Sequence, residues 1–229
     1  MSLPRPGRGE EECFNVMYIP EAFRGEDRST LVEFMRAHSF ATLVSAKDEG
    51  SLWASHLPLL VVEREETLVL LGHVARANEH WKAFGARESL AIFSGPHAYV
   101  SPSLYESAES VPTWNYVAVH AYGVPRVLAA DAADGLERVL EAMMETYEPA
   151  YRRQWDGLPA GFKARMLRGI VGFEMPVVRL EGKRKLSQNR SRADQERVAQ
   201  ALLDSSDPAA QAVGRLMEAN LRQDDAGGR

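Results

Sequence analysis

Hydrophobic positions recur along the chain in short apolar runs that tight turns separate. Strands are predicted at 40–46, 51–63, 67–74, 89–95, 113–128 and 169–182. Strands joined by short turns pair antiparallel, so the pattern predicts a mainly antiparallel sheet rather than alternating βαβ units. Six strands with apolar centres favour closure into a barrel, which removes exposed edges.

Helical spacing appears between and after these strands. A helix is predicted from an N-cap at Asp27 or Ser29 to about His38, with Leu31, Phe34 and Met35 on its buried face. Further helices are predicted at 77–85, 132–147 and 162–167, and a polar helical region begins near Ser191. The fold class is therefore α+β, a barrel with flanking helices.

Domain boundaries follow from composition. Residues 1–16 are rich in Pro, Gly and charge and are predicted to be disordered, as are the last residues, DDAGGR. We expect one barrel domain over 17–190 and a C-terminal helical extension with a disordered end over 191–229.

Composition then limits the function classes. The chain has 229 residues, 45% of them hydrophobic, and a formal net charge of −5, which argues against a surface devoted to nucleic acid. A single cysteine, Cys13, excludes an internal disulfide framework and fits a reducing cytoplasm. No apolar run reaches the roughly 20 residues that cross a bilayer, and the start lacks a signal-peptide pattern. We expect a cytoplasmic protein without membrane contact.

A candidate anion site lies at 72–78, where the third strand ends and a helix begins. Free N–H groups at a helix start and the guanidinium of Arg76 could together hold a phosphate dianion. Arg76 could equally be a surface arginine, and Asn78 could serve only as the N-cap. The residues by themselves do not separate these two interpretations.

The segment 94–103 is polar and contains His97 and Tyr99 among hydroxyl residues. We interpret it as a loop that lines a pocket, with a tight turn stabilised by hydroxyl groups as the alternative.

In the strand over 113–123, alternate residues face opposite sides. One face is aliphatic apart from one amide, and it consists of Asn115, Val117, Val119 and Ala121. The other carries Trp114, Tyr116, His120 and Tyr122. The first face should be core. The aromatic face should meet a partner subunit or a ring-shaped ligand, unless it is only a structural ladder.

Five of the eleven positions over 182–192 are basic and none is acidic. The interleaved Ser187, Gln188 and Asn189 suit a polar ring edge or a phosphate. A nucleic-acid patch is the competing interpretation, but no aromatic residue is interleaved for base stacking.

The histidines show no metal-ligand spacing, so no metal site is predicted. The sequence also lacks a GxSxG nucleophile motif and the glycine-rich phosphate loops of nucleotide-binding folds.

Seven stretches together resemble the PaiB-like family, described as FMN-binding negative transcriptional regulators. They are MYIPEAF (17–23), SHLPLL (55–60), GHVARANEHW (72–81), GPHAYVSPS (95–103), VPTWNYVAVHAYG (111–123), IVGFE (170–174) and KLSQNRS (185–191). They run in order from Met17 to Ser191. The joint match is specific because the stretches are rich in Trp, His, Asn and Pro.

The resemblance implies an FMN-binding split barrel and a homodimer with flavin at the subunit interface. In the wider superfamily, which resembles pyridoxamine-phosphate oxidase, the segment after the third core strand holds the flavin phosphate; here it contains His73, Arg76 and Asn78. The isoalloxazine and the second subunit are expected near a further set of residues, namely Trp114, Asn115, Lys185, Ser187, Gln188 and Asn189.

The superfamily's oxidases usually carry a paired Arg-Lys at the phosphate, whereas Ala77 follows Arg76 here. The missing cation predicts a weaker site, from which FMN could be lost on purification.

The leading hypothesis is an FMN-binding dimer with a regulatory or redox-linked output through a small molecule or another protein. A flavin-dependent oxidoreductase is the alternative enzyme, and a haem-binding or haem-degrading barrel would use His73, His97 or His120. Direct repression through the basic segment 183–192 is the least favoured, because no helix-turn-helix or basic recognition helix is predicted. The sequence leaves catalysis and its substrate open.

Overall fold

The computed structural model describes residues 17–24, 27–47, 49–128 and 133–227. Its strands are β1 (Phe40–Ala46), β2 (Leu52–Pro58), β3 (Leu60–Arg64), β4 (Thr67–Ala75), β5 (Ser89–Val100), β6 (Thr113–Gly123), β7 (Arg126–Val127) and β8 (Ile170–Lys185). Its α-helices are α1 (Arg28–Ala37), α2 (Ala133–Tyr147), α3 (Tyr151–Gly157), α4 (Ala160–Arg168), α5 (Arg192–Leu203) and α6 (Pro208–Gly227). Short 3-10 helices are η1 (Glu21–Phe23), η2 (Glu79–Ala83) and η3 (Pro102–Leu104).

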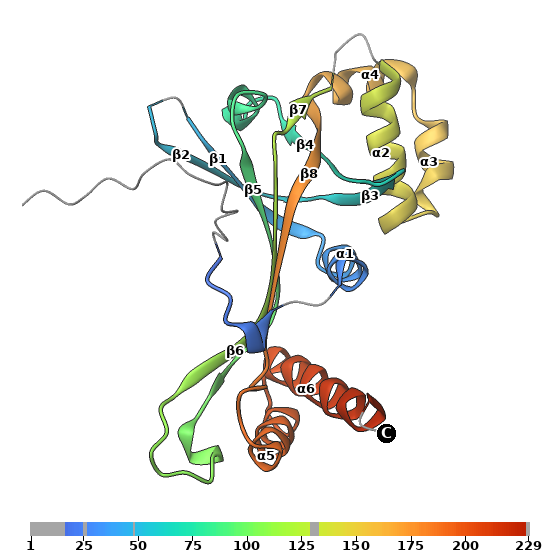
Figure 1. The fold of residues 1–229 in the computed structure, drawn as a ribbon. Coiled ribbons are helices and arrows are strands. Elements are labelled where there is room, and N and C mark those ends of the chain that lie inside the picture. Colours follow the sequence, from blue (N-terminus) through green and yellow to red (C-terminus); the bar gives the residue numbers. More distant parts are fainter. Residues whose placement is uncertain (1–16, 25–26, 48, 129–132, 228–229) are drawn as a thin grey trace, which may run out of the picture.

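The strands form an antiparallel sheet in the order β2-β1-β5-β6-β8-β4-β3, with β7 paired to β8. The strands at the two ends of this order, β2 and β3, are consecutive in the chain and are separated only by Leu59. The sheet must therefore curl until its ends meet (Figure 1). This confirms the predicted antiparallel split barrel with flanking helices.

The apolar run over 51–63 is two strands rather than the single strand that its pattern predicts. Pro58, which has no N–H to donate, ends β2. The N–H of Leu59 then binds the carbonyl oxygen of Ser39 at 2.9 Å. As a result β2 pairs with β1, whereas β3 pairs with β4 on the opposite edge.

The segment 94–100 belongs to β5, so the prediction of a polar loop there is wrong. The register between β5 and β6 shifts between Ser94 and His97, which places Gly95 and Pro96 in a bulge. A bulge tolerates both residues inside a strand. A Cβ at Gly95 would also lie 2.7 Å from the ring of Phe34, so the chain passes close to α1 at this point.

The strand predicted over 113–128 ends at Gly123, where the pairing of β6 with β8 changes register. A Cβ at this position would lie 2.1 Å from the carbonyl oxygen of Pro176. Only glycine allows the two backbones to approach so closely.

The main core fills the barrel and is closed by α1. Of the two predicted caps, Asp27 and Ser29, it is Asp27 that caps α1, since its carboxylate accepts the N–H of Thr30 at 3.0 Å. Leu31 and Met35 of α1 are buried among the inward side chains of the strands. A Cβ at Gly182 would lie 2.2 Å from Leu31, so glycine in β8 makes room for the helix.

Two smaller cores extend the barrel in opposite directions (Figure 1). Helix α2 covers the outside of β3 and β4 through Val139 and Met143. At the other end, α5 and α6 pack on the far ends of β5 and β6 through Val198, Val213 and Met217, among others. The sequence did not predict the short helix α3.

Helix α6 continues through Gly227, so helical structure extends into the segment that composition predicts to be disordered. The predicted disordered leader 1–16, with Cys13, lies outside the described residues. Among the helices that the structure describes, none is both long and apolar enough to cross a membrane.

Candidate functional site

One face of the sheet carries no α-helix of the described chain. It is the outward side of β2, β1, β5 and β6, opposite the side on which α1 packs (Figure 1). Its centre consists of partly exposed side chains, four of them apolar (Val44, Leu90, Ile92 and Ala118) and one a histidine, His120. Cross-strand pairing aligns them, since Ile92 lies between Thr42 and His120.

The predicted two-sidedness of residues 113–123 is confirmed. Asn115, Val117, Val119 and Ala121 are buried. The aromatic side is more open at one end, where Trp114 is 52% exposed, than at the other, where Tyr122 is buried.

Next to the aromatic residues, β8 contributes a row of charged side chains. Arg179 lies opposite Tyr122, with its guanidinium 3.6 Å from the ring centroid. Glu181 is buried, accepts the hydroxyl of Tyr122 at 3.1 Å, and binds Arg179 at 2.7 Å. Burial and then the carboxylate of Glu181 raise the pKa of the Tyr122 hydroxyl to about 12. Tyr122 is therefore a fixed hydrogen-bond donor at neutral pH.

The segment before α1 crosses this row. The backbone N–H of Met17 binds Glu181 at 3.1 Å, and the Nζ of Lys183 donates to the carbonyl oxygen of Tyr18 at 2.7 Å. Arg24 forms a backbone bridge with Lys183. These contacts bring η1 beside the end of β8.

The three residues predicted for the phosphate lie close in sequence but have different surroundings. His73 shares its face of β4 with Val69 and Leu71, which pack against α2. Its Nδ1 is buried without a partner among the described residues, and burial lowers its pKa. Asn78 instead caps η2 and donates to the hydroxyl of Ser55 at 3.0 Å.

Arg76 is exposed, but two hydrogen bonds to the backbone fix its side chain. Its side chain donates to the carbonyl oxygens of Arg168 at 2.8 Å and Ile170 at 3.0 Å, where α4 leads into β8. Two of the five guanidinium N–H groups are used in this way, so the remaining donors could still bind an anion. The predicted helix at this point is only the five-residue η2.

Behind this segment lies a buried polar chain that the sequence did not indicate. His80 is fully buried, and its two ring nitrogens each lie 2.8 Å from a hydroxyl, Ser55 on one side and Ser45 on the other. Ser45 continues to Ser89 at 2.6 Å. Burial lowers the pKa of His80 to about 4. The only signal in the sequence was that Ser45 and Ser55 are polar positions within the apolar strand patterns.

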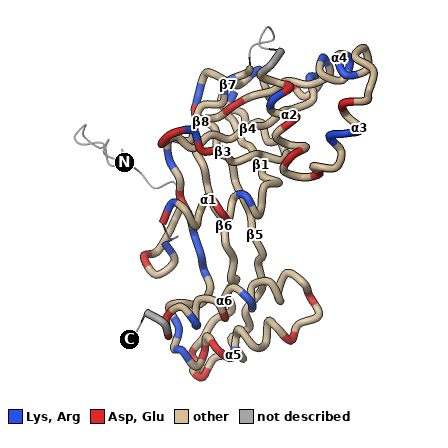
Figure 2. Tube along the Cα trace, turned by 90° about the vertical axis from the view of Figure 1, so that its right-hand side faces the viewer, with Lys and Arg blue, Asp and Glu red and all other residues tan. Residues whose placement is uncertain are grey.

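The basic segment 183–192 is not a free cationic patch, because each of its five cations has a partner. Besides Lys183, Arg184 binds Asn220, Lys185 binds Thr113, Arg190 lies over the ring of Tyr105, and Arg192 binds Glu196 and Asp225. Figure 2 shows charges of both signs intermixed at the α5–α6 end.

Four of the remaining predicted residues come together in one cavity of about 140 Å³. They are Asn115, Lys185, Ser187 and Asn189. Gln188 turns into the chain instead, where it donates to the carbonyl oxygen of Arg184 and accepts the N–H of Leu186. Trp114 lies with His97 and Tyr99 on a different cavity, of about 440 Å³, between β5, β6 and the α5–α6 pair.

No group of three or more His, Cys, Asp or Glu residues in the described part of the chain is placed to hold a metal ion.

Comparison with known proteins identifies the family. Residues 17–179 match the family model described as "Putative FMN-binding domain". The chain belongs to this family. A relative from Bacillus subtilis, protease synthase and sporulation protein PAI 2, is 38% identical over 210 residues, which cover 90% of this chain and 99% of the relative. The resemblance to PaiB-like proteins is thereby confirmed.

Two solved structures share the fold. The FAD and heme binding protein from Mycobacterium smegmatis is similar with a TM-score of 0.54 at 15% identity, over 71% of this chain and 73% of that chain. The flavocytochrome Anf3 from Azotobacter vinelandii is similar with a TM-score of 0.55 at 14% identity, over 71% and 69%. At such low identity the likeness concerns the fold alone.

Proposed function

We propose that this protein is a homodimer that binds FMN at the face of β2, β1, β5 and β6, and that its output is regulatory or redox-linked. The observation that carries the proposal is this face, which exposes apolar side chains on a barrel of the FMN-binding family. An isologous dimer covers the same patch on both copies at once. Partly exposed apolar strand residues would otherwise be a risk for aggregation.

Of the residues predicted to bind the flavin phosphate, Arg76 has hydrogen-bond donors that suit this role. Arg76 is fixed by two carbonyl oxygens and keeps further N–H donors for an anion. Lys185 and the neighbouring Ser187 and Asn189 would face the ring system or the second subunit, and the exposed Trp114 offers an aromatic surface. When bound, a flavin supplies one- and two-electron redox chemistry, while the chain's own groups bind and orient it.

His73 and Asn78 remain predicted contacts. The unpaired Nδ1 of His73 could accept a hydrogen bond, whereas the side chain of Asn78 already has partners within the chain.

A regulatory output is supported by the name of the relative PAI 2, which refers to protease synthesis and sporulation. Direct DNA binding receives little support. The cations of 183–192 have partners. Residues 192–227, which form α5, a short turn and α6, contain four Lys or Arg against seven Asp or Glu. We therefore propose an indirect output through a small molecule or another protein.

The absorption spectrum and a titration with FMN test the proposal. We expect oxidised-flavin bands, in the purified protein or after FMN is added, and twice the 25.5 kDa chain mass in sedimentation. A Soret band would favour the haem alternative, and turnover of a substrate would favour the oxidoreductase.

The variant Ile92→Asp places a charge at the centre of the proposed interface, where Ile92 is only partly buried in the single chain. It should give a folded monomer with lost or weakened FMN binding. Val178→Asp, at a side chain that is 73% exposed, is the matched control and should leave the dimer intact. An Ile92→Asp protein that remains dimeric and binds FMN normally would rule out this interface.

A further inference from the structure

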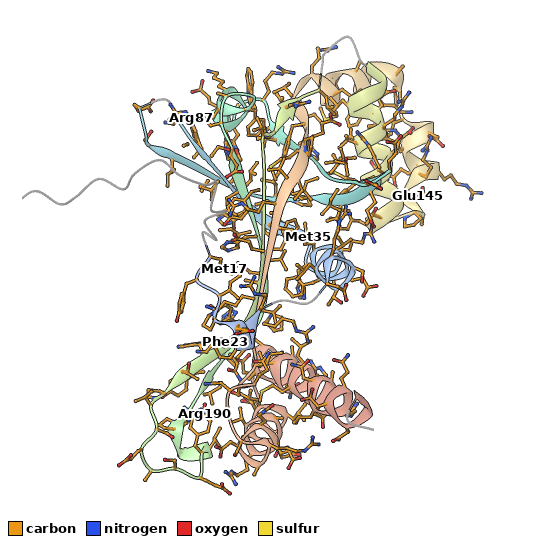
Figure 3. All side chains as sticks on the ribbon, viewed as in Figure 1. Met17, Phe23, Met35, Arg87, Glu145 and Arg190 are labelled. Atoms are coloured by element: carbon orange, nitrogen blue, oxygen red, sulfur yellow. The ribbon has the colours of Figure 1, made fainter. Side chains whose placement is uncertain are left out.

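The cavity of about 140 Å³ lies at the narrow waist between the barrel and the α5–α6 end. Figure 3 shows Phe23 at this waist and Arg190 below it. The walls come from four separate segments: Phe23 of η1, Tyr105 between β5 and β6, the start of β6 with the two residues before it (111–115), and the end of β8 with the residues after it (185–190).

Tyr105, one of the lining residues, carries an unpaired hydrogen-bond donor. The residue is 8% exposed, and its hydroxyl is buried without a hydrogen-bond partner among the described residues. Buried hydroxyls are nearly always hydrogen-bonded, so an unpaired one calls for an explanation. A ligand that accepts this hydrogen bond would supply the missing partner.

The charge of the lining is one-sided. Lys185 and Arg190 are cations, and none of the described residues that line the cavity is acidic. The ammonium of Lys185 has three N–H donors and gives one to the hydroxyl of Thr113. Burial and the nearby Lys183 lower the pKa of Lys185, because both disfavour its charged form. An anion beside the ammonium would stabilise that charged form.

Other residues of the wall contact one another within the chain. Asn115 and Ser187, both buried, bind each other through the amide nitrogen and the hydroxyl at 2.9 Å. Ser187 has a φ of 65°, a left-handed conformation that is costly for serine and that often marks functional sites. The guanidinium of Arg190 lies 4.1 Å from the ring centroid of Tyr105 and packs on that ring.

We propose that this cavity binds the carboxylate group of a small organic acid. The hydroxyl of Tyr105 and the ammonium of Lys185 donate to the carboxylate, and Arg190 adds positive charge. Phe23 and Pro112 form the apolar wall for the hydrocarbon part. Pockets for larger ligands usually measure roughly 300–1,000 Å³. This cavity therefore suits a molecule of a few heavy atoms and not a whole flavin.

The inference deepens the proposed function, because it gives a flavin-binding protein a small-molecule ligand next to residues expected near the flavin. Acid binding itself does not require flavin. It can therefore be measured on flavin-free protein, while FMN binding is measured separately.

The experiment is calorimetric titration of the flavin-free chain with acetate, benzoate and inorganic phosphate. We expect at least one of the two acids to bind more tightly than phosphate. Tyr105→Phe and Lys185→Met should each weaken that binding about tenfold or more, the usual loss for a hydrogen bond to a charged group. Tyr147→Phe and Lys163→Met, distant residues that also donate hydrogen bonds, are the matched controls and should bind as the wild type does.

Thermal unfolding without ligand separates a binding role from a structural one. Because the hydroxyl of Tyr105 is unpaired, Tyr105→Phe should leave the unfolding midpoint unchanged or raise it. A clear fall would show that the hydroxyl is paired and would overturn the proposal. Three other results would also overturn the proposal. They are failure of both acids to bind at tens of millimolar, tighter binding of phosphate than of either acid, and equal acid affinity in Lys185→Met and the wild type. Loss of FMN binding with acid binding retained would count against the proposed function alone.

Discussion

The buried His80 should make the free energy of unfolding depend on pH between about 4 and 6.5. Its ring is enclosed by Ser45 and Ser55, and burial lowers its pKa from 6.5 to about 4. A histidine with a lowered pKa in the folded state takes up a proton more readily when the chain is unfolded. Its contribution is therefore fully present above pH 6.5 and is lost as the pH falls toward 4.

The size of the effect follows from the shift. One pKa unit corresponds to 1.36 kcal/mol, so the full difference approaches about 3 kcal/mol, and at pH 5 about 2 kcal/mol should be lost relative to pH 7.5. Replacing the ring removes this dependence. His80→Gln should also destabilise the protein at pH 7.5 by about 1–3 kcal/mol, because a shorter amide leaves buried serine hydroxyls unpaired.

Urea unfolding at a series of pH values provides the measurement. Trp53, whose ring lies 6.1 Å from His80 and nearly parallel to it, reports on this region by fluorescence. The wild type should lose about 2 kcal/mol more than His80→Gln between pH 7.5 and pH 5. His56→Gln, at an exposed histidine, is the control and should lose as much as the wild type. Equal losses in the wild type and in His80→Gln would refute the reasoning.

Two further predictions concern ligands. Arg76→Ala should weaken FMN binding by about tenfold to a hundredfold in a fluorescence titration and leave riboflavin binding nearly unchanged, since the lost bond is to phosphate. Arg64→Ala, which breaks an exposed ion pair with Glu174, is the control, and equal loss for both ligands would contradict phosphate recognition by Arg76. The chain alone should show no tight, sequence-specific DNA binding in a gel shift at physiological salt. Nanomolar retention of one promoter fragment, abolished by neutralising residues 183–185, would contradict this.

Much of the fold could be predicted because its signals are local. The Asp27 cap, the strand over 40–46 and the alternation along 113–123 each depend on residues within a few positions of one another. The run over 51–63 shows what local signals cannot predict. Its apolar pattern is continuous, but which strand pairs with each half depends on neighbours elsewhere in the chain.

The residues of the candidate site also fall into those that the sequence indicated and those that only the structure revealed. The sequence identified Asn115, Lys185, Ser187 and Asn189 by residue type and by resemblance, and the structure brings these four to one cavity. It did not single out Tyr105, whose importance comes from a hydroxyl that burial leaves unpaired.

By itself the sequence determined the antiparallel strands, the family and four of the residues that line the small cavity. Only the tertiary structure decided the surroundings of each polar group. Asn115 and Ser187 are 72 positions apart and bind each other, and the cations of 183–192 find partners on other elements. Residue type and spacing specify which bonds a side chain can make, but burial and the arrival of distant segments decide which of those bonds form.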